Sequence, residues 1–227
     1  MGIFDRFKKS DKPEVVSRGF HAIQVKELIH LNKDAVQVSF EIPVDLQQEF
    51  KFIPGQYINL ELLINGKKER RSYSICSGPN EPLAVAVKRV DKGLVSNFLN
   101  DQASIDLPIW IAKPEGNFKL DSAAKNIVCL AAGSGITPML SMAKHLSSAT
   151  KMHLFYGSQS KSTILFEKDL AEIPSVNSTH FLSKEQADGY EFGRLTKDQF
   201  TEKQQRMAIL EEMSLNFLGK KQTRQTY

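Results

Sequence analysis

The first half of the chain alternates short apolar runs with turn residues, a pattern typical of β-strands. Runs rich in Val and Ile predict strands over residues 21–31, 35–42, 50–64, 69–75, 83–90 and 107–112, and Pro54-Gly55 interrupts the third of them. Asn65-Gly66 separates two of these runs and is a strong hairpin signal. A short helix is expected over residues 93–100. Several short strands with regular turns predict an antiparallel six-stranded β-barrel over residues 19–120, after a flexible N-terminus of residues 1–18.

After residue 120 the pattern changes to strands that alternate with helices. Residues 126–132 form a continuous apolar run, which we expect to be a strand buried on both faces. Further strands are expected over residues 151–156 and 178–182, with helices over residues 138–146 and 165–171. This alternation predicts a parallel α/β domain over residues 125–221. Its last part, residues 201–221, predicts one amphipathic helix, followed by a polar tail at residues 222–227.

Composition describes an ordinary soluble globular protein and excludes several function classes. The 227 residues are 41% hydrophobic and 25% charged, with a net charge of +4. The sequence contains no dense Lys/Arg stripe of the kind that would indicate nucleic-acid binding. No apolar run approaches the ~20 residues of a membrane span. The two cysteines favour a reducing, cytoplasmic setting and cannot supply the four thiolates of an iron–sulfur cluster. The five scattered histidines predict no metal site.

The run Arg71-Ser72-Tyr73-Ser74 combines a cation, an aromatic ring and hydroxyls on one extended segment. Alternate side chains of a strand share a face, so Arg71 and Tyr73 are expected to point one way unless the strand bends. Arg can hold a pyrophosphate bidentately, Tyr can lie on a flat heteroaromatic ring, and a hydroxyl can bond a ring nitrogen. A flavin nucleotide needs all three groups, although an ordinary surface strand also carries such residues.

A glycine-rich turn, residues 133–138, follows the apolar run at 126–132. Its two glycines would let backbone amides approach an anion closely. We expect Thr137 to be the N-cap and Pro138 the first helical residue, so that free N–H groups face a pyrophosphate. The turn fits neither the Rossmann fingerprint, nor a P-loop, nor a nucleophile elbow. Its place after a parallel strand favours nucleotide binding over an ordinary tight βα turn.

Two shorter signals add to this picture. Gly93 opens the predicted helix at 93–100, which makes either a second anion site at a helix N-terminus or a plain cap. The loop Gly157-Ser158-Gln159 follows the strand at 151–156, where nucleotide-binding domains meet the adenosine ribose. This loop is polar, carries Lys161 and lacks an acidic residue, which favours NADPH over NADH.

These segments, in this order, resemble the ferredoxin–NADP reductase superfamily, especially the reductase components of bacterial oxygenases of the phenylacetyl-CoA epoxygenase type. The resemblance covers residues 21–194 and rests on several short motifs that agree in order and spacing. They are Pro54-Gly55-Gln56-Tyr57, Arg71-Ser72-Tyr73-Ser74, residues 93–96, Pro114-Glu115-Gly116-Asn117-Phe118, residues 133–138, Tyr156-Gly157 and Gly193-Arg194-Leu195.

The resemblance implies an FAD-binding barrel and an NAD(P)-binding α/β domain, with the flavin between them. Arg71 would bind FAD phosphate, Tyr73 would stack on the isoalloxazine, and Ser74 would bond near flavin N5. Ser74 and Thr137 are the implied catalytic residues. Gly93, Val95 and Ser96 would hold the flavin pyrophosphate, with backbone contacts from Val87 and Lys88. The implied contacts to the nicotinamide nucleotide are Gly133, Gly135, Thr137, Pro138, Gly157, Ser158 and Gln159.

The implied function is an FAD-dependent oxidoreductase that takes hydride from NAD(P)H. Electrons would pass to a separate protein acceptor, a ferredoxin, a flavodoxin or an oxygenase component, expected to be acidic because the chain is basic. The chain departs from the family after residue 199, where a Cys-Gly-Pro segment and a ferredoxin domain are expected but absent. The nucleotide domain is therefore expected to be truncated. The alternatives are a flavin-binding module with impaired NAD(P)H oxidation and an interaction protein without a cofactor.

Overall fold

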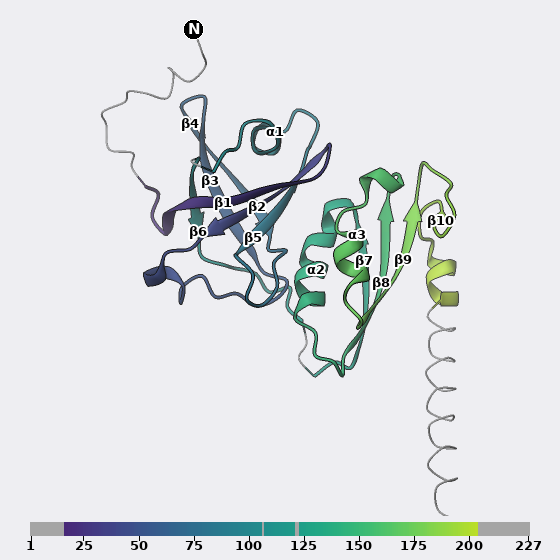
Figure 1. The fold of residues 1–227 in the computed structure, drawn as a ribbon. Coiled ribbons are helices and arrows are strands. Elements are labelled where there is room, and N and C mark those ends of the chain that lie inside the picture. Colours follow the sequence, from purple (N-terminus) through teal and green to yellow (C-terminus); the bar gives the residue numbers. More distant parts are fainter. Residues whose placement is uncertain (1–15, 106, 121–122, 204–227) are drawn as a thin grey trace, which may run out of the picture.

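Two units follow one another along the chain, and the computed structural model describes them over residues 16–105, 107–120 and 123–203 (Figure 1). The first contains a six-stranded antiparallel sheet and the second a four-stranded parallel sheet, so the predicted fold class is confirmed. Most of the predicted flexible N-terminus (1–18), most of the predicted amphipathic helix (201–221) and the tail at 222–227 lie outside the described residues.

The first sheet has the strand order β4-β3-β6-β1-β2-β5, with antiparallel pairing between neighbours. A bridge between Ile75 and Val85 joins the ends of the two outer strands and closes the sheet into a barrel. The helix α1 (Leu94–Asp101) lies between β5 and β6 in the chain. The strands are β1 (Phe20–Asn32), β2 (Ala35–Glu41), β3 (Tyr57–Ile64), β4 (Lys67–Ser74), β5 (Ala84–Lys88) and β6 (Pro108–Ala112).

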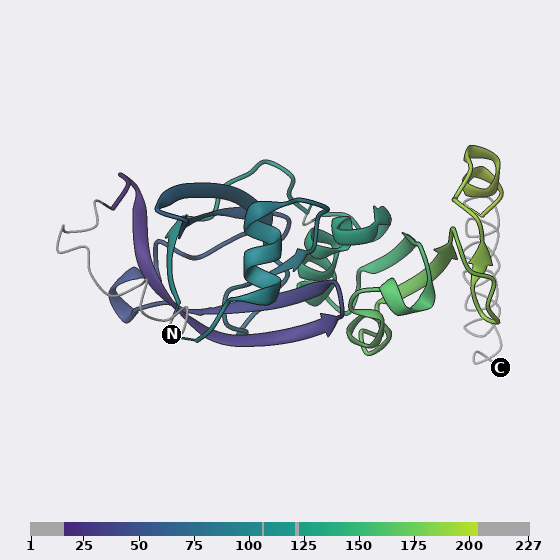
Figure 2. The same cartoon turned by 90° about the horizontal axis from the view of Figure 1, so that it is seen from above.

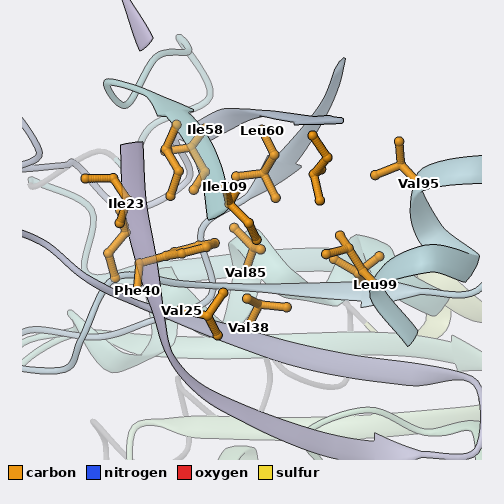
Figure 3. Packing of buried hydrophobic residues seen from close by; sticks show 14 of the residues in the cluster. Ile23, Val25, Val38, Phe40, Ile58, Leu60, Val85, Val95, Leu99 and Ile109 are labelled. Atoms are coloured by element: carbon orange, nitrogen blue, oxygen red, sulfur yellow. The ribbon is translucent and has the colours of Figure 1, made fainter. Parts of the chain in front are cut away.

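The inward side chains of the strands fill the barrel with aliphatic residues and Phe40 (Figure 3). Val95 and Leu99 of α1 belong to the same buried cluster, so the helix is anchored on the barrel core. Burial of each such side chain contributes about 1.5–3 kcal/mol to the free energy of folding. This packing therefore holds α1 in one direction on the barrel. The N-terminal end of α1 is thereby held at a constant place relative to β4 and β5.

The hairpin predicted at Asn65-Gly66 is confirmed, because Ile64 pairs with Lys67 across a two-residue turn. Both turn residues have positive φ, 53° and 73°, as the tight hairpin turn between right-twisted strands requires. The strand predicted over residues 50–64 is wrong before its expected interruption at Pro54-Gly55, since β3 begins only at Tyr57. Gly55 has a φ of 96° and lies after a proline, so residues 50–56 run as a loop.

The second sheet is parallel, with the order β10-β9-β8-β7. Its strands are β7 (Asn126–Ala132), β8 (Lys151–Ser158), β9 (Val176–Leu182) and β10 (Glu191–Phe192), a two-residue strand that the sequence did not predict. The helices α2 (Ile136–Lys144) and α3 (Glu167–Ala171) join β8 in one buried cluster. Phe155 of β8 contacts Phe200 instead, at 5.6 Å between ring centroids, where residues 197–203 are helical.

The strand β7 has the predicted bounds, but the prediction that both of its faces are buried is wrong. Val128 and Leu130 are 40% and 53% exposed, whereas Cys129 is buried. The reason is that β7 is the last strand of the sheet among the described residues, with β8 as its one strand neighbour. An apolar run identifies a buried type of strand but carries no information on its position in the sheet.

The helix α2 connects the two units, which lie side by side in both views (Figures 1 and 2). Ser141 is fully buried and donates its hydroxyl to the carbonyl of Ser77 in the barrel unit at 2.9 Å. Lys144 makes an ion pair with Glu81 at 2.9 Å. These contacts fix the turn before α2 relative to the barrel. None of the helices in the described ranges is long and apolar enough to cross a bilayer.

Candidate functional site

A pocket of about 450 Å³ lies between β4, the start of α1 and the turn before α2. Three segments that are far apart in the sequence meet there, and none of the described residues that line the pocket is acidic. The lining residues are Arg71, Ser72, Tyr73, Ser74, Ala86, Lys88, Val90, Gly93, Leu94, Val95, Ser96, Ser134, Gly135, Thr137 and Pro138. We call this cavity the first pocket.

All four residues of the run at 71–74 line the first pocket. Tyr73 and Arg71 lie opposite the buried Ile58 and Leu60, whereas Ser72 lies opposite Asn59 and bonds it, as the expected alternation requires. Tyr73 packs partly on the barrel core, and burial raises the pKa of its phenol to about 12 although Arg71 lowers it. The phenol is therefore neutral at physiological pH. The distance from Arg71 Nη1 to Glu69 Oε2 is 3.5 Å. The guanidinium remains accessible because the Arg71 side chain is about half exposed.

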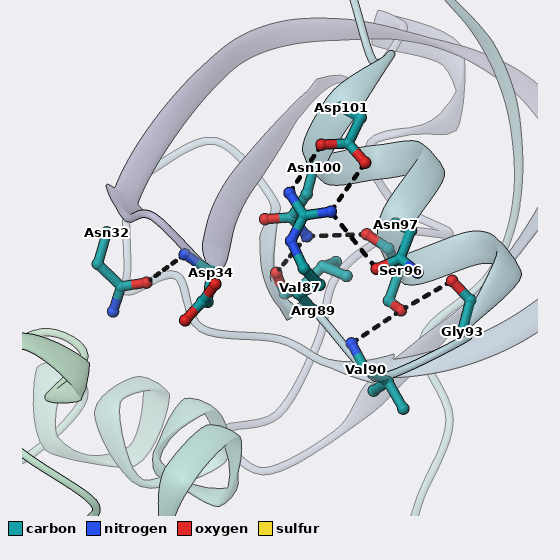
Figure 4. Close-up of polar contacts among 10 residues, drawn as sticks. All are labelled: Asn32, Asp34, Val87, Arg89, Val90, Gly93, Ser96, Asn97, Asn100 and Asp101. Carbon is teal, nitrogen blue, oxygen red and sulfur yellow. Dashed lines mark hydrogen bonds and ion pairs between the residues drawn. The ribbon is translucent and has the colours of Figure 1, made fainter.

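The start of α1 forms one wall of the first pocket and needs glycine for reasons of space. A Cβ on Gly93 would lie 2.5 Å from Ser96 Oγ and 2.9 Å from Val90 Cβ. Ser96 Oγ accepts the N–H of Val90 and donates to the carbonyl of Gly93 (Figure 4). The Ser96 hydroxyl thus holds the loop, and the groups available to an anion are the free backbone N–H groups at the helix start.

A polar network behind this wall holds β5 and α1 together (Figure 4). Arg89 makes two hydrogen bonds to the carboxylate of Asp101, at 2.7 and 2.8 Å. The Asn100 amide donates to the carbonyl of Val87 at 3.1 Å. Val87 is fully buried, does not line the first pocket, and its carbonyl is already bonded, so the structure does not bring this predicted contact residue to the cavity.

The turn before α2 forms the opposite wall, and its geometry corrects one prediction. Gly133 has a φ of 52° and begins a 3₁₀ turn over Gly133–Gly135, and α2 itself begins at Ile136. Thr137 is therefore not the N-cap; it lies inside the helix and donates Oγ1 to the carbonyl of Ser134 at 3.0 Å. Gly135, the N-cap residue, already has right-handed helical backbone angles, so the helix begins before Thr137 and the free N–H groups are those of the turn.

A second pocket of about 720 Å³ lies at the carboxyl ends of β7, β8 and β9. It shares Lys88 and Ser134 with the first pocket, and Gly133 lines it beside them, so the two cavities meet at the glycine turn. The predicted residues Gly157, Ser158 and Gln159 line it, and none of its described lining residues is acidic. The remaining members are Leu130, Ala131, Ala132, Phe155, Phe181, Ser183, Arg194 and Leu195.

Two cations of the second pocket come from segments outside the glycine turn. The Lys88 ammonium lies 3.8 Å from the position that a Cβ on Gly133 would occupy, so this barrel residue reaches the α/β unit through its side chain. The sequence predicted only backbone contacts for Lys88. Arg194 was not predicted as a site residue, although the segment Gly193-Arg194-Leu195 was a signal that could have identified it.

Comparisons with known proteins assign each unit to a domain family. An oxidoreductase FAD-binding domain matches residues 22–120, and an oxidoreductase NAD-binding domain matches residues 129–227. The chain is 31% identical over 162 residues to a subunit of 1,2-phenylacetyl-CoA epoxidase from Escherichia coli, covering 68% of this chain and 45% of that protein. It is 30% identical over 166 residues to the ferredoxin reductase component of 3-ketosteroid-9-alpha-monooxygenase of Mycobacterium tuberculosis, covering 66% and 45%. The chain thus spans less than half the length of these relatives.

Solved structures show the same fold at lower identity. A ferredoxin NADP+ reductase from Neisseria gonorrhoeae with bound FAD and NADP superposes with a TM-score of 0.69 at 16% identity, covering 85% of this chain and 80% of that one. The flavohem-like FAD/NAD binding domain of nitric oxide dioxygenase from Vibrio cholerae gives a TM-score of 0.71 at 23% identity, covering 79% and 81%. A barrel followed by an α/β unit is therefore a known arrangement.

Proposed function

The chain belongs to the ferredoxin–NADP reductase family, with its FAD-binding and NAD-binding oxidoreductase domains, and from this premise we propose that it passes electrons from NAD(P)H through FAD to a separate protein acceptor. The observation that carries the proposal is the meeting of β4, the start of α1 and the glycine turn in one cavity. Such a cavity suits two nucleotides whose reactive rings must approach each other. We assign residues 19–120 to FAD and residues 125–221 to the nicotinamide nucleotide.

The residues of the first pocket fit FAD in charge and shape. Arg71 and the free N–H groups at the start of α1 suit a pyrophosphate, because one supplies a fixed cation and the other a positive helix end. Tyr73 offers a neutral ring that rests on the barrel core, suited to stacking on a flat heterocycle. FAD, when bound, supplies two-electron acceptance from the nicotinamide and single-electron donation to the acceptor. Ser74 and Thr137 line this pocket from opposite walls and would orient the reacting rings.

The second pocket fits the nicotinamide dinucleotide. The glycine turn would hold its pyrophosphate on backbone N–H groups, with Lys88 beside it. An acidic residue at the end of β8 would favour NADH through the ribose hydroxyl, but Ser158 and Gln159 stand there. Arg194 adds a cation to the same cavity, which supports a preference for NADPH and its 2′-phosphate.

The acceptor is proposed to be an acidic protein, such as a ferredoxin, a flavodoxin or an oxygenase component. Two relatives are, by name, a subunit of an epoxidase and a ferredoxin reductase component of a monooxygenase. The strand β4 carries Lys67, Lys68, Arg70 and Arg71, and the chain as a whole has a net charge of +4. Complementary charge accelerates association. The buried free thiols of Cys76 and Cys129 support a cytoplasmic setting.

A flavin-binding module with impaired NAD(P)H oxidation is the second candidate. Its support is the edge position of β7, whose exposed Leu130 lines the second pocket, so that one wall of this cavity is open among the described residues. Binding there would be weaker than in a cavity enclosed on all sides, because less of the ligand is desolvated.

The visible spectrum of the purified protein separates these candidates. Flavin bands that bleach within seconds of adding NADPH support the reductase. Bands that persist with both NADPH and NADH exclude it and leave the flavin module. A colourless protein that takes up no added FAD excludes both, and the ratio of the NADPH and NADH bleaching rates tests the coenzyme preference.

A further inference from the structure

The phenol of Tyr156 links two loops at the carboxyl end of the parallel sheet. Tyr156 lies on β8, is fully buried and lines neither pocket. Its hydroxyl donates to the carbonyl of Gly133 at 3.1 Å and accepts the N–H of Leu165 at 3.2 Å. Gly133 begins the glycine turn, and Leu165 precedes α3. One side chain therefore fixes the backbone that follows β7 and the backbone that follows β8.

The bond to Gly133 completes the hydrogen bonding of a carbonyl at the base of the turn. The N–H of Ile136 also bonds this carbonyl, and the phenol takes its second acceptor position. Because the Tyr156 hydroxyl and the Ile136 N–H both bond the Gly133 carbonyl, the turn presents its N–H groups to the pockets in one orientation. Burial raises the pKa of the Tyr156 phenol, so the hydroxyl keeps its proton and remains a donor at physiological pH.

The bond from Leu165 supports a strained backbone. The next residue, Phe166, has a φ of 60° in the left-handed region that side chains other than glycine rarely adopt. Such conformations persist where the surrounding structure over-determines them. Leu165 is itself buried, so the phenol satisfies an N–H that would otherwise be lost in the core.

We propose that Tyr156 is a positioning residue for nicotinamide nucleotide binding, acting through Gly133 on the N–H groups of the glycine turn. The inference rests on the proposed function, because it assigns that turn to the nucleotide. A phenylalanine would fill the same buried space, so the contribution specific to tyrosine is the hydroxyl with its two backbone bonds. The partners of these two bonds, the Gly133 carbonyl and the Leu165 N–H, both belong to loops that follow strand ends. The bonds therefore position loop backbone in addition to filling the core.

The test replaces Tyr156 by phenylalanine in the full chain loaded with FAD. Loss of one hydrogen bond to the turn carbonyl should weaken nucleotide binding by roughly tenfold. We expect the Kd for NADP+, measured by flavin difference absorbance, and the KM for NADPH to rise about tenfold. FAD content should not change, and kcat should stay within about twofold. The matched control is Tyr190→Phe, because the Tyr190 hydroxyl bonds Glu167 and not the turn.

Amide hydrogen exchange gives a readout independent of activity. The peptide covering residues 131–139 should exchange faster in Tyr156→Phe than in the wild type and in Tyr190→Phe. Equal exchange in all three proteins, or a Kd for NADP+ that does not change in Tyr156→Phe, overturns the proposal. If Tyr156→Phe does not fold, exchange of the Leu165 amide in the wild type tests the proposal instead. Rapid exchange of this amide excludes its bond to the Tyr156 hydroxyl and overturns the proposal, whereas slow exchange supports it. A wild type that NADPH does not bleach would refute the reductase function alone, since exchange needs no turnover.

Discussion

Lys88 of the barrel and Gly133 of the α/β unit lie next to each other across the boundary of the two units, with 3.8 Å between the ammonium and the position of a Cβ on Gly133. Lys88 makes no ion pair with the described residues, so its charge is not compensated by a neighbouring carboxylate. A cation in this place is available to an anionic ligand held at the turn. The contact depends on α2, which holds the turn against the barrel through Ser141 and Lys144.

The first prediction concerns the charge of Lys88. Lys88→Gln should raise the Kd for NADP+ about tenfold, because a charge-assisted bond to a phosphate is lost. Lys88→Arg should retain most of the affinity. The control is Lys151→Gln, which removes an exposed charge at the start of β8, at the other end of this strand from the second pocket. Titrations followed by flavin absorbance at low and moderate salt check this, and equal Kd values in Lys88→Gln and Lys151→Gln would contradict it.

The second prediction concerns retention of FAD by the run at 71–74. Tyr73→Ala and Arg71→Ala should each weaken FAD binding by about tenfold, because one removes a stacking surface and the other a phosphate ligand. Gln159 lines the second pocket and not the first, so Gln159→Ala should leave FAD retention unchanged. Because the pKa of Tyr73 is about 12, its ionisation should not alter FAD affinity between about pH 6 and 9. Flavin content after dialysis distinguishes these variants, and similar losses in all three would refute the assignment.

Local chemistry explains which parts of the fold were predictable. The hairpin at Asn65-Gly66 was predictable from two residues, because Asn and Gly adopt the positive φ values of this turn at low energetic cost. Strand β7 was found with its bounds, but its edge position was not, since strand order depends on pairing between distant segments. The two-residue β10 has no period from which it could be detected.

The site shows the same limit. The run at 71–74 and the glycine turn were visible because each concentrates special chemistry in a few consecutive residues. The side chain of Lys88 was missed because its significance comes from contact between the two units, and Arg194 was missed because a segment far along the chain comes to the pocket only in the folded α/β unit. The N-cap role of Thr137 was wrong because a residue of good capping type does not show where the helix actually begins. Val87 was included for a backbone contact, but its carbonyl bonds Asn100 and the residue does not line the first pocket.

The third prediction concerns space at Gly93. Its φ of −73° is ordinary, so Gly93→Ala should act only through crowding of Ser96 and Val90. We expect a loss of about 1–3 kcal/mol in the free energy of unfolding and weaker FAD binding, because the start of α1 must shift. Gly135→Ala is the stability control, since nothing lies within 4 Å of its Cβ. Thermal melting of both variants tests this, and identical melting temperatures would show that the crowding is relieved without cost.

The fourth prediction concerns pH and Glu61, a barrel residue that lines neither pocket. The Glu61 side chain is fully buried, 2.6 Å from Arg70 Nε and 3.0 Å from Lys68 Nζ, and it accepts a hydrogen bond from Ser17. Burial acts to raise the pKa of Glu61, but the hydrogen bonds from Arg70, Lys68 and Ser17 outweigh it and hold the pKa below its usual value of 4.5. The ionised carboxylate is therefore favoured by folding.

The sign follows from linkage. A carboxyl whose pKa is lower in the folded state adds stability above its unfolded pKa, and this stability is lost as the pH falls through the folded value. The barrel should therefore lose stability progressively below about pH 4.5, while Glu61→Gln should show a flatter dependence there. At pH 7 we expect Glu61→Gln to lose about 1–3 kcal/mol, less than for a fully buried pair because the Arg70 side chain is 56% exposed.

Urea unfolding of both proteins between about pH 3.5 and 7 measures this difference. The matched control is Glu41→Gln, whose ion pair with Lys26 is exposed at 58% and 48% and should be worth less than about 1 kcal/mol at any pH. Parallel stability curves for the wild type and Glu61→Gln would show that the carboxylate contributes no net charge stabilisation. The experiment also reports on Ser17, because its hydroxyl fixes the chain before β1 through the same carboxylate.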